Sequence, residues 1–476
     1  MVSKNSRRGF IKASAAGAAG LAIGSRASSY ARILGANDRV RVAFVGPGDR
    51  ARDALIPSFL RLAGELNFEP VAVCDIWNKR RDEGADFVAQ EADKLKVPIA
   101  GEQLAKARNT DELYSMKNVD AVIIATADFQ HAYHCIEAVR AGKDVYVEKP
   151  ISNCIREGRL MVEAARKTNR VVQVGLQQRS GTHFQRAVRI VQEGQLGKIH
   201  YVQCWNHEFR NREGMGNPPD SEPPPGLDWD FWLGPAPKVP FNANRFGGSF
   251  RWFFDYGGGK LADWGSHLID VVHWAMNVQS PLSASSSGGK YYLTDNRDTP
   301  DTQEVTYEYP GFLLHYSVLH HNTYGHNGNP GAKPYGSYGI LFHGAEGTLF
   351  IDRAGYQVTP QSEAHTEPDA PKRDVVDDLT GTSVYYTSKL TPAWGTTSVQ
   401  HPPHVRNFLD CVKTRQRPNA DIEAGHWTTT ACHLGNISLR VGQKVLWDAG
   451  VERITNHPEA NSLVTRRLRT PWKLES

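Results

Sequence analysis

The chain has 476 residues with a formal net charge of +4, and 22% of its residues are charged and 40% hydrophobic. This is the composition of a globular protein and excludes a disordered chain. Neither the charge nor any basic stripe indicates a nucleic-acid partner, and the length suits two domains. The six cysteines have no metal-ligand spacing, so we expect no metal, and buried thiols at Cys74 and Cys204.

The N-terminus has the pattern of an export signal. Arg7 and Arg8 precede a modest apolar run at residues 13–23. We therefore predict a twin-arginine signal peptide over residues 1–36, cleaved within 27–36, and a periplasmic location. The alternative is the basic start of a cytosolic protein. The run is too short to span a bilayer, so we expect no membrane contact beyond export. Because this route carries folded proteins, an exported nicotinamide enzyme should hold its cofactor tightly.

The first structured segment predicts a dinucleotide site. A β-branched run at residues 40–45 leads into Gly46-x-Gly48-x-x-Ala51, and a helix is predicted from Ala51 to Ala63. A strand before this motif and a helix after it are the context that gives it weight. Gly46 allows the tight turn, Gly48 lets a pyrophosphate approach the backbone, and Ala51 lets the helix pack on the strand.

The second strand predicts which dinucleotide binds. The run at residues 69–75 ends in Asp75, which is placed to accept hydrogen bonds from ribose hydroxyls. Lys79, Arg80 and Arg81 follow closely and could instead bind a 2′-phosphate. We predict NAD as the cofactor, with NADP as the alternative.

Strands and helices alternate through the first third of the chain. This pattern predicts an NAD(P)-binding Rossmann domain over residues 37–176, with a doubly wound parallel sheet and its ligand crevice at the carboxyl ends of the strands. The predicted strands are 40–45, 70–74, 120–125, 144–147 and 171–175, and predicted helices include 83–95 and 129–141.

One of these strands delivers a lysine to the crevice. The run Val145-Tyr-Val-Glu148-Lys149-Pro150 places Lys149 at the end of a strand, and Pro150 restricts its backbone to an extended conformation. A lysine beside a nicotinamide ring can bind a substrate hydroxyl. A surface lysine in a loop is the alternative.

The second half of the chain changes character. We predict an α+β domain over residues 177–447 with a large, mostly antiparallel open sheet whose free face covers the cofactor or pairs subunits. The overall class is α/β. Helices are predicted at 184–193, 404–414 and 426–441, and strands at 199–207, 289–293, 302–309, 312–320, 338–343 and 347–351. A Pro/Gly-rich loop, 214–225, is expected to form a wall of the site. No secondary structure is predicted for 360–400. The tail 448–476 should lie along a neighbouring surface.

A glycine-rich turn in this half precedes an acid–base pair. After Gly257, Gly258 and Gly259, a helix is predicted from about Leu261. Asp263 and His267 are four residues apart and therefore lie on one helix face. A carboxylate beside an imidazole suits proton transfer, although a capping aspartate and a packed histidine would explain the spacing about as well. Further acidic and histidine residues on this helix lack a recognised metal-ligand spacing.

Aromatic residues are dense from Trp229 to Tyr256. Aromatic faces stack on the C–H faces of sugars, so the segment indicates a carbohydrate site. A place in the core explains any single one of them better.

Together, the glycine turn, Glu148-Lys149-Pro150 and the segment from Gly257 to His267 closely resemble the Gfo/Idh/MocA oxidoreductase family, over residues 38 to about 445. The resemblance implies that Lys149, Asp263 and His267 bind the reacting hydroxyl and move its proton, and that the sheet often mediates dimers or tetramers. Many members have T-P-N-x-x-H after the third core strand. Here Thr126-Ala-Asp-Phe-Gln-His131 lacks the proline and the asparagine.

These observations predict an NAD(P)-dependent oxidoreductase that acts on a sugar, polyol or glycoside and works as a homo-oligomer. Two alternatives remain. One is a redox-neutral, NAD-dependent glycoside hydrolase, because some exported relatives oxidise, eliminate and reduce again. The other is a non-catalytic sugar-binding module. The predicted catalytic residues are Lys149, Asp263 and His267. The predicted cofactor residues are Gly46, Gly48, Asp49, Arg50, Asp75, Thr126, His131, Glu148 and Lys149, and the predicted substrate residues are Arg251, Trp252, Tyr256 and His207.

Overall fold

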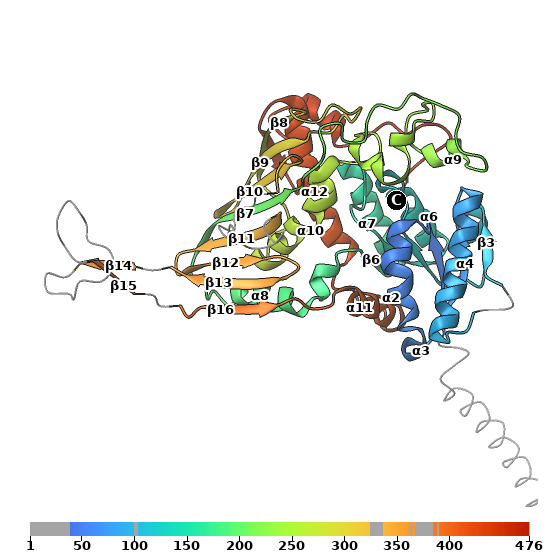
Figure 1. The fold of residues 1–476 in the computed structure, drawn as a ribbon, viewed down its shortest axis with the longest axis horizontal. Helices are drawn as coiled ribbons and strands as arrows, with labels where there is room; N and C mark the ends of the chain where they lie inside the picture. The colour runs from blue at the N-terminus through green and yellow to red at the C-terminus, as the bar shows by residue number, and fades with distance from the viewer. Residues whose placement is uncertain are drawn as a thin grey trace, which may run out of the picture.

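The computed structural model describes residues 39–99, 103–323, 337–361, 363–366, 384–387 and 390–475. The predicted signal peptide, residues 1–36, lies outside them. Two sheets organise the described part, and Figure 1 shows the smaller one on the right and the larger one on the left, with helices between them. Among the described residues, no helix has both the length and the apolarity needed to cross a membrane.

The N-terminal sheet is six-stranded and parallel, with strand order β3-β2-β1-β4-β5-β6. This confirms the predicted doubly wound sheet. Its strands are β1 (Val40–Val45), β2 (Phe68–Cys74), β3 (Ala105–Ala107), β4 (Ala121–Ile124), β5 (Asp144–Val147) and β6 (Val172–Val174).

Helices cover both faces of this sheet. One core contains residues of α5 (Thr110–Tyr114), α6 (Asp128–Arg140) and α7 (Ile155–Thr168). The other core contains residues of α2 (Ile56–Leu60), α4 (Asn78–Leu95) and, from much later in the chain, α11 (His401–Thr414). The chain therefore returns to its first domain after building its second.

The helix predicted over 51–63 is wrong in detail. The segment forms a π-helix, η1 (Ala51–Leu55), then α2 and α3 (Ala63–Leu66). Pro57 stands in the first turn of α2, and a proline lacks the N–H that a continuous α-helix needs at that point. The Ile56 N–H donates to the Ala51 carbonyl, five residues back, which is the π-type spacing.

The C-terminal sheet has ten strands in the order β16-β13-β12-β11-β7-β10-β9-β8-β17-β18. β7 and β10 run parallel and the other described pairs are antiparallel, as predicted. The strands are β7 (Ile199–His207), β8 (Ser283–Gly289), β9 (Thr302–Tyr309), β10 (Phe312–Leu319), β11 (Tyr338–Gly344), β12 (Gly347–Ile351), β13 (Gly355–Pro360), β16 (Ala393–Thr396), β17 (Val445–Asp448) and β18 (Arg453–Ile454).

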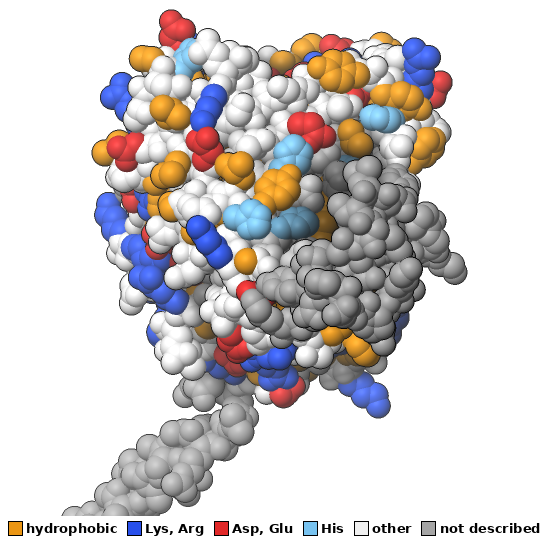
Figure 2. Space-filling model, turned by 90° about the vertical axis from the view of Figure 1, so that its left-hand side faces the viewer, with side chains coloured by type: hydrophobic (Ala, Val, Ile, Leu, Met, Phe, Trp, Pro, Cys, Tyr) orange, Lys and Arg blue, Asp and Glu red, His pale blue; other side chains and the backbone are white. Residues whose placement is uncertain are grey.

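Helices pack on one face of this sheet, the face toward the first domain (Figure 1). They are α8 (Thr182–Gln192), α10 (Gly259–Met276) and α12 (Ile422–Val441). The strands alternate accordingly: Val202 and Cys204 are buried, whereas Tyr201 and Gln203 are half-buried. In Figure 2, histidine and hydrophobic side chains gather on the side of the molecule that carries this sheet. The pairing of subunits through its outer face stays a prediction.

The strand predicted at 289–293 is wrong, because β8 occupies the serine-rich segment just before it. Small side chains suit β8, since α12 packs against it and a Cβ at Gly288 would lie 2.3 Å from the Thr302 carbonyl oxygen. Residues 291–293 form a loop instead. Their three N–H groups donate to the carboxylate of Asp301.

Within 360–400, where no structure was predicted, the described residues include three strands. β16 pairs with β13 at the edge of the large sheet, and β14 (Glu363–Thr366) pairs with β15 (Val384–Thr387) as a separate hairpin. These strands are short and mostly polar, so neither a period of two nor an apolar run reveals them.

Four short helices complete the connections: η2 (Gln177–Ser180), α9 (Trp229–Leu233), η3 (Ala243–Arg245) and η4 (Gly247–Trp252). The tail contains η5 (Pro458–Leu463) and then runs back along the first domain. There, Arg466 pairs with Glu157 of α7 at 2.6 Å, and the Trp472 ring lies against Tyr133 of α6. All six cysteines are buried and unbonded to one another.

Candidate active site

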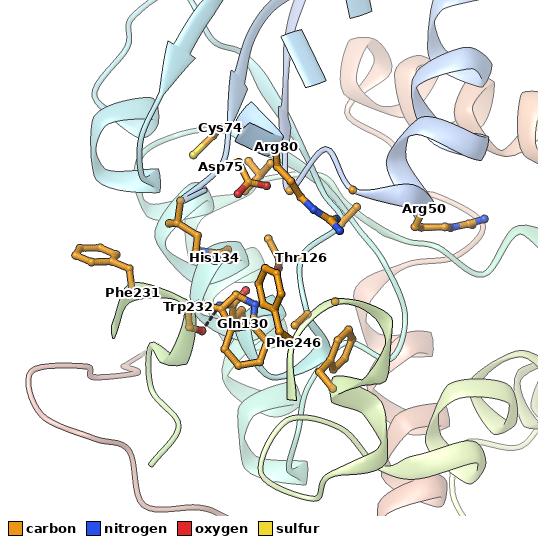
Figure 3. A pocket seen from close by; sticks show the side chains of 18 of the residues that line it. Arg50, Cys74, Asp75, Arg80, Thr126, Gln130, His134, Phe231, Trp232 and Phe246 are labelled. Carbon is orange, nitrogen blue, oxygen red and sulfur yellow. Dashed lines mark hydrogen bonds between the residues drawn. The ribbon is translucent and has the colours of Figure 1, made fainter. Parts of the chain in front are cut away.

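A cavity of about 250 Å³ opens at the carboxyl ends of β1, β2 and β4. We call it the glycine-turn cavity. Figure 3 shows Asp75 and Arg80 on one side of it and the rings of Phe231, Trp232 and Phe246 on another. Its lining includes the predicted cofactor residues Gly46, Gly48, Asp49, Arg50, Asp75 and Thr126.

Local backbone geometry explains the two glycines. Gly46 has φ +74°, and a Cβ there would lie 2.9 Å from Cγ2 of Thr126. A side chain would be strained by conformation and by contact. A Cβ at Gly48 would fall 2.5 Å from a guanidinium nitrogen of Arg80. The turn is therefore a cradle in which side-chain atoms are absent where a phosphate needs room.

Asp75 directly follows β2 and lines the cavity, and its Oδ1 accepts the N–H of Trp77 at 2.8 Å. Burial raises its pKa to about 6 against the opposing effects of the Trp77 N–H and of Arg80. A carboxylate here can accept ribose hydroxyls above that pH. Arg80, which the sequence offered as an alternative 2′-phosphate ligand, also lines the cavity and lies over Gly48.

The wall opposite the glycine turn comes from the second domain. Trp232 of α9 is buried, and its carbonyl accepts a hydrogen bond from Gln130 of α6, drawn as a dashed line in Figure 3. Phe246, Phe250 and Arg251 continue this wall. The cavity therefore lies between the two domains, with its apolar surface supplied by the aromatic segment.

A second, smaller cavity of about 210 Å³ adjoins the first. We call it the lysine cavity. The two cavities share Arg50, Ala125, Thr126 and Arg251 as lining residues, so a ligand in one can contact a ligand in the other. The remaining lining residues are Asp128, His131, Glu148, Lys149, Gln177, Trp264, His267 and Arg353.

Lys149 is held by Asp263 of α10. Its Nζ lies 2.6 Å from Asp263 Oδ1 and 2.9 Å from the Asp263 carbonyl oxygen, and both side chains are largely buried. Burial alone would raise the pKa of Asp263, but the charges of Lys149 and Arg251 outweigh it and hold that pKa well below its usual range. The carboxylate is therefore a fixed negative charge that orients Lys149 into the cavity.

His267 lies one helical turn beyond Asp263 and lines the same cavity. Burial, together with the positive charges of Arg353 and Lys149, lowers its pKa well below its ordinary value. Its Nδ1 is buried and has no hydrogen-bond partner among the described residues. The ring is therefore neutral at pH 7, and its Nδ1 is available for a further hydrogen bond.

Two further predicted residues hold the loops of the site together. Glu148 pairs with Arg50 at 2.9 Å and so joins the end of β5 to the glycine turn. His131 lies with Nδ1 2.7 Å from the Pro150 carbonyl oxygen and Nε2 3.2 Å from that of Thr126. Both residues border the lysine cavity while anchoring its backbone.

Three predicted substrate residues lie outside the linings of both cavities. His207 ends β7 and bonds to the hydroxyl of Ser317 at 3.0 Å. The Trp252 ring packs against His320, and the Tyr256 ring packs against Phe129 and Trp232. Only Arg251 of the four lines a cavity, and it borders both.

Sequence reasoning missed four residues of the lysine cavity. They are Asp128, Gln177, Trp264 and Arg353. Trp264 adjoins the predicted Asp263 and could have been found from the helix face. Arg353 follows β12, some 200 residues after Lys149, and no local pattern distinguishes it. Burial raises the pKa of Asp128 to about 7.

The described residues fit a bound dinucleotide. The glycine cradle leaves room at the end of β1, Asp75 offers an acceptor at the end of β2, and the cavity continues to Lys149 and His267 through shared walls. These are the positions that pyrophosphate, ribose and nicotinamide need in this fold. No group of three or more His, Cys, Asp or Glu side chains in the described part of the chain is arranged to hold a metal ion.

Two sequence families match the chain. The family described as "Oxidoreductase family, NAD-binding Rossmann fold" (GFO_IDH_MocA) matches residues 40–176. The family described as "Oxidoreductase family, C-terminal alpha/beta domain" matches residues 181–307 and 394–474. Together they span both sheets.

Curated relatives match over a shorter stretch. A "Glycosyl hydrolase family 109 protein" of Shewanella baltica is 28% identical over 221 residues, which is 43% of this chain and 46% of that protein. An "Alpha-N-acetylgalactosaminidase" of Shewanella oneidensis is 26% identical over the same shares of the two chains. The alignments thus cover less than half of these relatives.

Solved structures share the fold over most of the chain. The WlbA dehydrogenase from Bordetella pertussis, in complex with NADH and UDP-GlcNAcA, has a TM-score of 0.59 and 17% identity over 86% of this chain and 99% of that one. Levoglucosan dehydrogenase, in complex with NADH and levoglucosan, has a TM-score of 0.57 and 16% identity over 86% and 99%.

Proposed function

The chain belongs to the Gfo/Idh/MocA oxidoreductase family and has its NAD-binding Rossmann domain, and from this premise we propose that it oxidises or reduces a carbinol carbon of a sugar, polyol or glycoside. The observation that carries the proposal is the arrangement of Lys149, Asp263 and His267 beside a cavity that shares walls with the glycine turn.

Each of these residues has a role in the proposal. Lys149 donates a hydrogen bond to the reacting hydroxyl oxygen, and Asp263 fixes the direction of its ammonium. His267, neutral and with an unbonded Nδ1, takes the hydroxyl proton during oxidation and returns it during reduction. Bound nicotinamide supplies or accepts the hydride.

The first test uses the purified full-length protein. Nucleotide released by denaturation is identified by mass spectrometry, and sugars and polyols are then screened by nicotinamide absorbance at 340 nm. We expect co-purified NAD(H) and a substrate-dependent change in absorbance that is lost in Lys149→Met. Turnover by Lys149→Met at the wild-type rate would refute the assigned chemistry. A protein that binds sugars with no change in absorbance would support the non-catalytic alternative.

A second candidate function rests on the names of the curated relatives, which include glycosyl hydrolases. In this reaction a carbinol is oxidised to a ketone, the ketone acidifies the neighbouring C–H, and loss of that proton expels the glycosidic alkoxide. Water then adds to the double bond, and the stored hydride returns to the ketone, so no net oxidation occurs. Release of 4-nitrophenol from 4-nitrophenyl α-N-acetylgalactosaminide without added cofactor would favour it.

We also propose that residues 1–36 direct export by the twin-arginine route and that the enzyme works as a homo-oligomer. The paired arginines and the open sheet face support these two proposals. Changing Arg7 and Arg8 to lysine should retain the protein in the cytoplasm, as measured by fractionation. Light scattering of the mature chain measures its oligomeric state.

A further inference from the structure

Arg353 brings an additional positive charge to the lysine cavity from the second domain. It stands just after β12, and its guanidinium carbon lies 4.8 Å from the centre of the Trp264 ring. Stacking of this kind holds the plane of a guanidinium in place. Burial lowers the pKa of Arg353, but an arginine in a protein keeps its charge. A fixed cation therefore borders the cavity that contains Lys149 and His267.

The other cations of the lysine cavity have carboxylate partners. Arg50 pairs with Glu148 at 2.9 Å. Lys149 pairs with Asp263 at 2.6 Å, and Arg251 lies 3.7 Å from the same carboxylate. For Arg353, no described residue provides a carboxylate within ion-pair distance, and its Nε is a buried atom without a hydrogen-bond partner in the described part of the chain.

Charge balance in the cavity therefore favours an anion. Four cations, Arg50, Lys149, Arg251 and Arg353, line the cavity. Their carboxylate partners are Glu148 and Asp263, whose pKa values are held below their usual range by these cations. Burial raises the pKa of the third carboxyl group, Asp128, to about 7. A buried charge without a partner is costly. A neutral ligand would leave that cost in place, and an anionic ligand would remove it.

The positive charge of Arg353 is not placed to bind the dinucleotide phosphates. Arg50 and Arg80 line the glycine-turn cavity, whereas Arg353 lines the lysine cavity alone. The lysine cavity also has buried polar atoms without hydrogen-bond partners among the described residues, namely Thr126 Oγ1, Gln177 Oε1 and Arg251 Nε. Buried polar atoms are normally hydrogen-bonded, so these atoms are consistent with a polar ligand in the cavity that Arg353 also lines.

We propose that Arg353 binds an anionic substituent of the substrate, so that the enzyme prefers an acidic sugar, such as a uronic acid, to the neutral sugar of the same configuration. This inference rests on the proposed oxidoreductase function and deepens it. A guanidinium fork pairs with carboxylate, sulfate or phosphate alike, and these three substituents are separated by experiment. Trp264, which lies beneath Arg353, keeps the fork directed at the substituent.

The test compares matched pairs of ligands on the full-length protein. Isothermal titration calorimetry measures the binding of methyl glucuronide and methyl galacturonide, each against its neutral methyl glycoside, and of glucose 6-sulfate and 6-phosphate against glucose. We expect the acidic member of at least one pair to bind the wild type about 10- to 100-fold more tightly, as one charge-assisted hydrogen-bonding pair provides. The pair that responds identifies the substituent.

Variants assign the preference to Arg353. Arg353→Met should lose the preference for the acid while binding the neutral member within roughly twofold of the wild type, and Arg353→Lys should keep part of it. Arg210→Met is the matched control, since Arg210 also lies over a tryptophan ring, that of Trp252, but outside both cavities. Circular dichroism melting confirms that each variant is folded.

Different outcomes separate this inference from the proposed function. Equal binding of acidic and neutral sugars by the wild type, no binding of any acidic sugar, or a preference that survives in Arg353→Met would overturn the role of Arg353. Arg353-dependent binding of an acid that causes no change at 340 nm and no glycoside cleavage would retain the anion site and overturn the oxidoreductase proposal. Oxidation of neutral sugars without Arg353-dependent binding of an acid would retain the oxidoreductase proposal and overturn the anion site.

Discussion

The ammonium of Lys149, at the end of β5, lies 2.6 Å from the carboxylate of Asp263 on α10. The pair joins the Rossmann domain to the second domain beside the lysine cavity. Lys149 also donates to the Asp263 carbonyl oxygen at 2.9 Å. One ion pair therefore contributes both to the site and to the attachment of the two domains.

We predict that Lys149→Met and Asp263→Asn are each destabilising, by about 2–3 kcal/mol, because each leaves a largely buried partner without its counter-charge. The double variant should be less destabilised than the sum of the two single variants, with a coupling of about 1–2 kcal/mol. The free energies of unfolding of the wild type, the two single variants and the double variant, measured in urea, complete the double-mutant cycle. Strict additivity would mean that the ion pair contributes nothing to stability.

Asp75 should determine both the affinity for NADH and its pH dependence. Asp75→Asn removes the charged acceptor for ribose hydroxyls, and we expect NADH binding to weaken about 10- to 100-fold. Because the pKa of Asp75 is about 6, wild-type affinity should fall as the pH drops below 6 and the carboxylate is protonated. Fluorescence titration measures both effects.

The variant Asp82→Asn is the control for Asp75→Asn, since Asp82 lies outside the cavity and pairs with Lys106. A retained affinity for NADH in Asp75→Asn, or tighter binding of NADPH than of NADH by the wild type, would show that Arg80 rather than Asp75 selects the cofactor.

Three glycine substitutions show whether backbone strain or side-chain contact is the reason for glycine at position 46 of the dinucleotide turn. Gly64→Ala meets nothing within 4 Å and lies in α3, so it should be neutral or slightly stabilising. Gly142→Ala has open space but φ +77°, and should cost about 1 kcal/mol. Gly46→Ala combines a similar φ with a close contact to Thr126. It should lower the free energy of unfolding by more than Gly142→Ala does, and it should also weaken NADH binding.

Urea unfolding and NADH titration of the three glycine variants measure these effects. Equal stability of Gly46→Ala and Gly142→Ala would mean that Thr126 moves aside without cost, and that strain alone decides the choice of glycine in the turn.

His404 should make stability depend on pH. Its Nε2 lies 2.9 Å from the Val174 carbonyl oxygen, its Nδ1 lies 2.8 Å from the Ser180 hydroxyl, and burial lowers its pKa to about 4. The neutral ring satisfies both contacts. As the pH falls from about 6.5 to 4, the unfolded chain takes up a proton that the folded chain does not, so stability is lost over that window.

The pKa difference at His404 corresponds to about 3 kcal/mol. In His404→Gln this pH-dependent contribution is absent, so the variant should be less stable than the wild type at pH 7 and the gap should narrow toward pH 4. Urea midpoints at pH 7, 6, 5 and 4 measure it. A gap that stays constant would mean that His404 takes up its proton in the folded protein as readily as in the unfolded chain.

Parts of the site could be predicted from the sequence because local chemistry decides them. A glycine is needed where φ is positive, as at Gly46, and an acid that ends the second strand of such a unit reaches the crevice, as Asp75 does. The spacing of Asp263 and His267 placed them on one face of a helix that the structure contains. These features depend on residues within one or two turns of each other.

Other predictions failed where packing overrides local preference. The segment 289–293 was predicted as a strand, but the small residues before it form β8, which packs against α12 and lies close to β9 at Gly288. Trp252 and Tyr256 belong to the aromatic segment that suggested a sugar site, and His207 ends the strand β7 before it; all three lie outside the linings of both cavities, and their role in binding substrate stays a prediction. An aromatic-rich sequence does not show which of its rings reaches a cavity.

The sequence alone determined the parallel sheet, the dinucleotide turn and the identity of the lysine and the acid–base pair, since each is encoded by neighbouring residues. Only the tertiary structure decided that Arg353 and Trp264 line the same cavity as Lys149, and that Asp263 serves as a counter-ion held in its charged form. The reason is physical: charge balance and burial arise from groups far apart in the chain, and they exist only once the two domains have folded against each other.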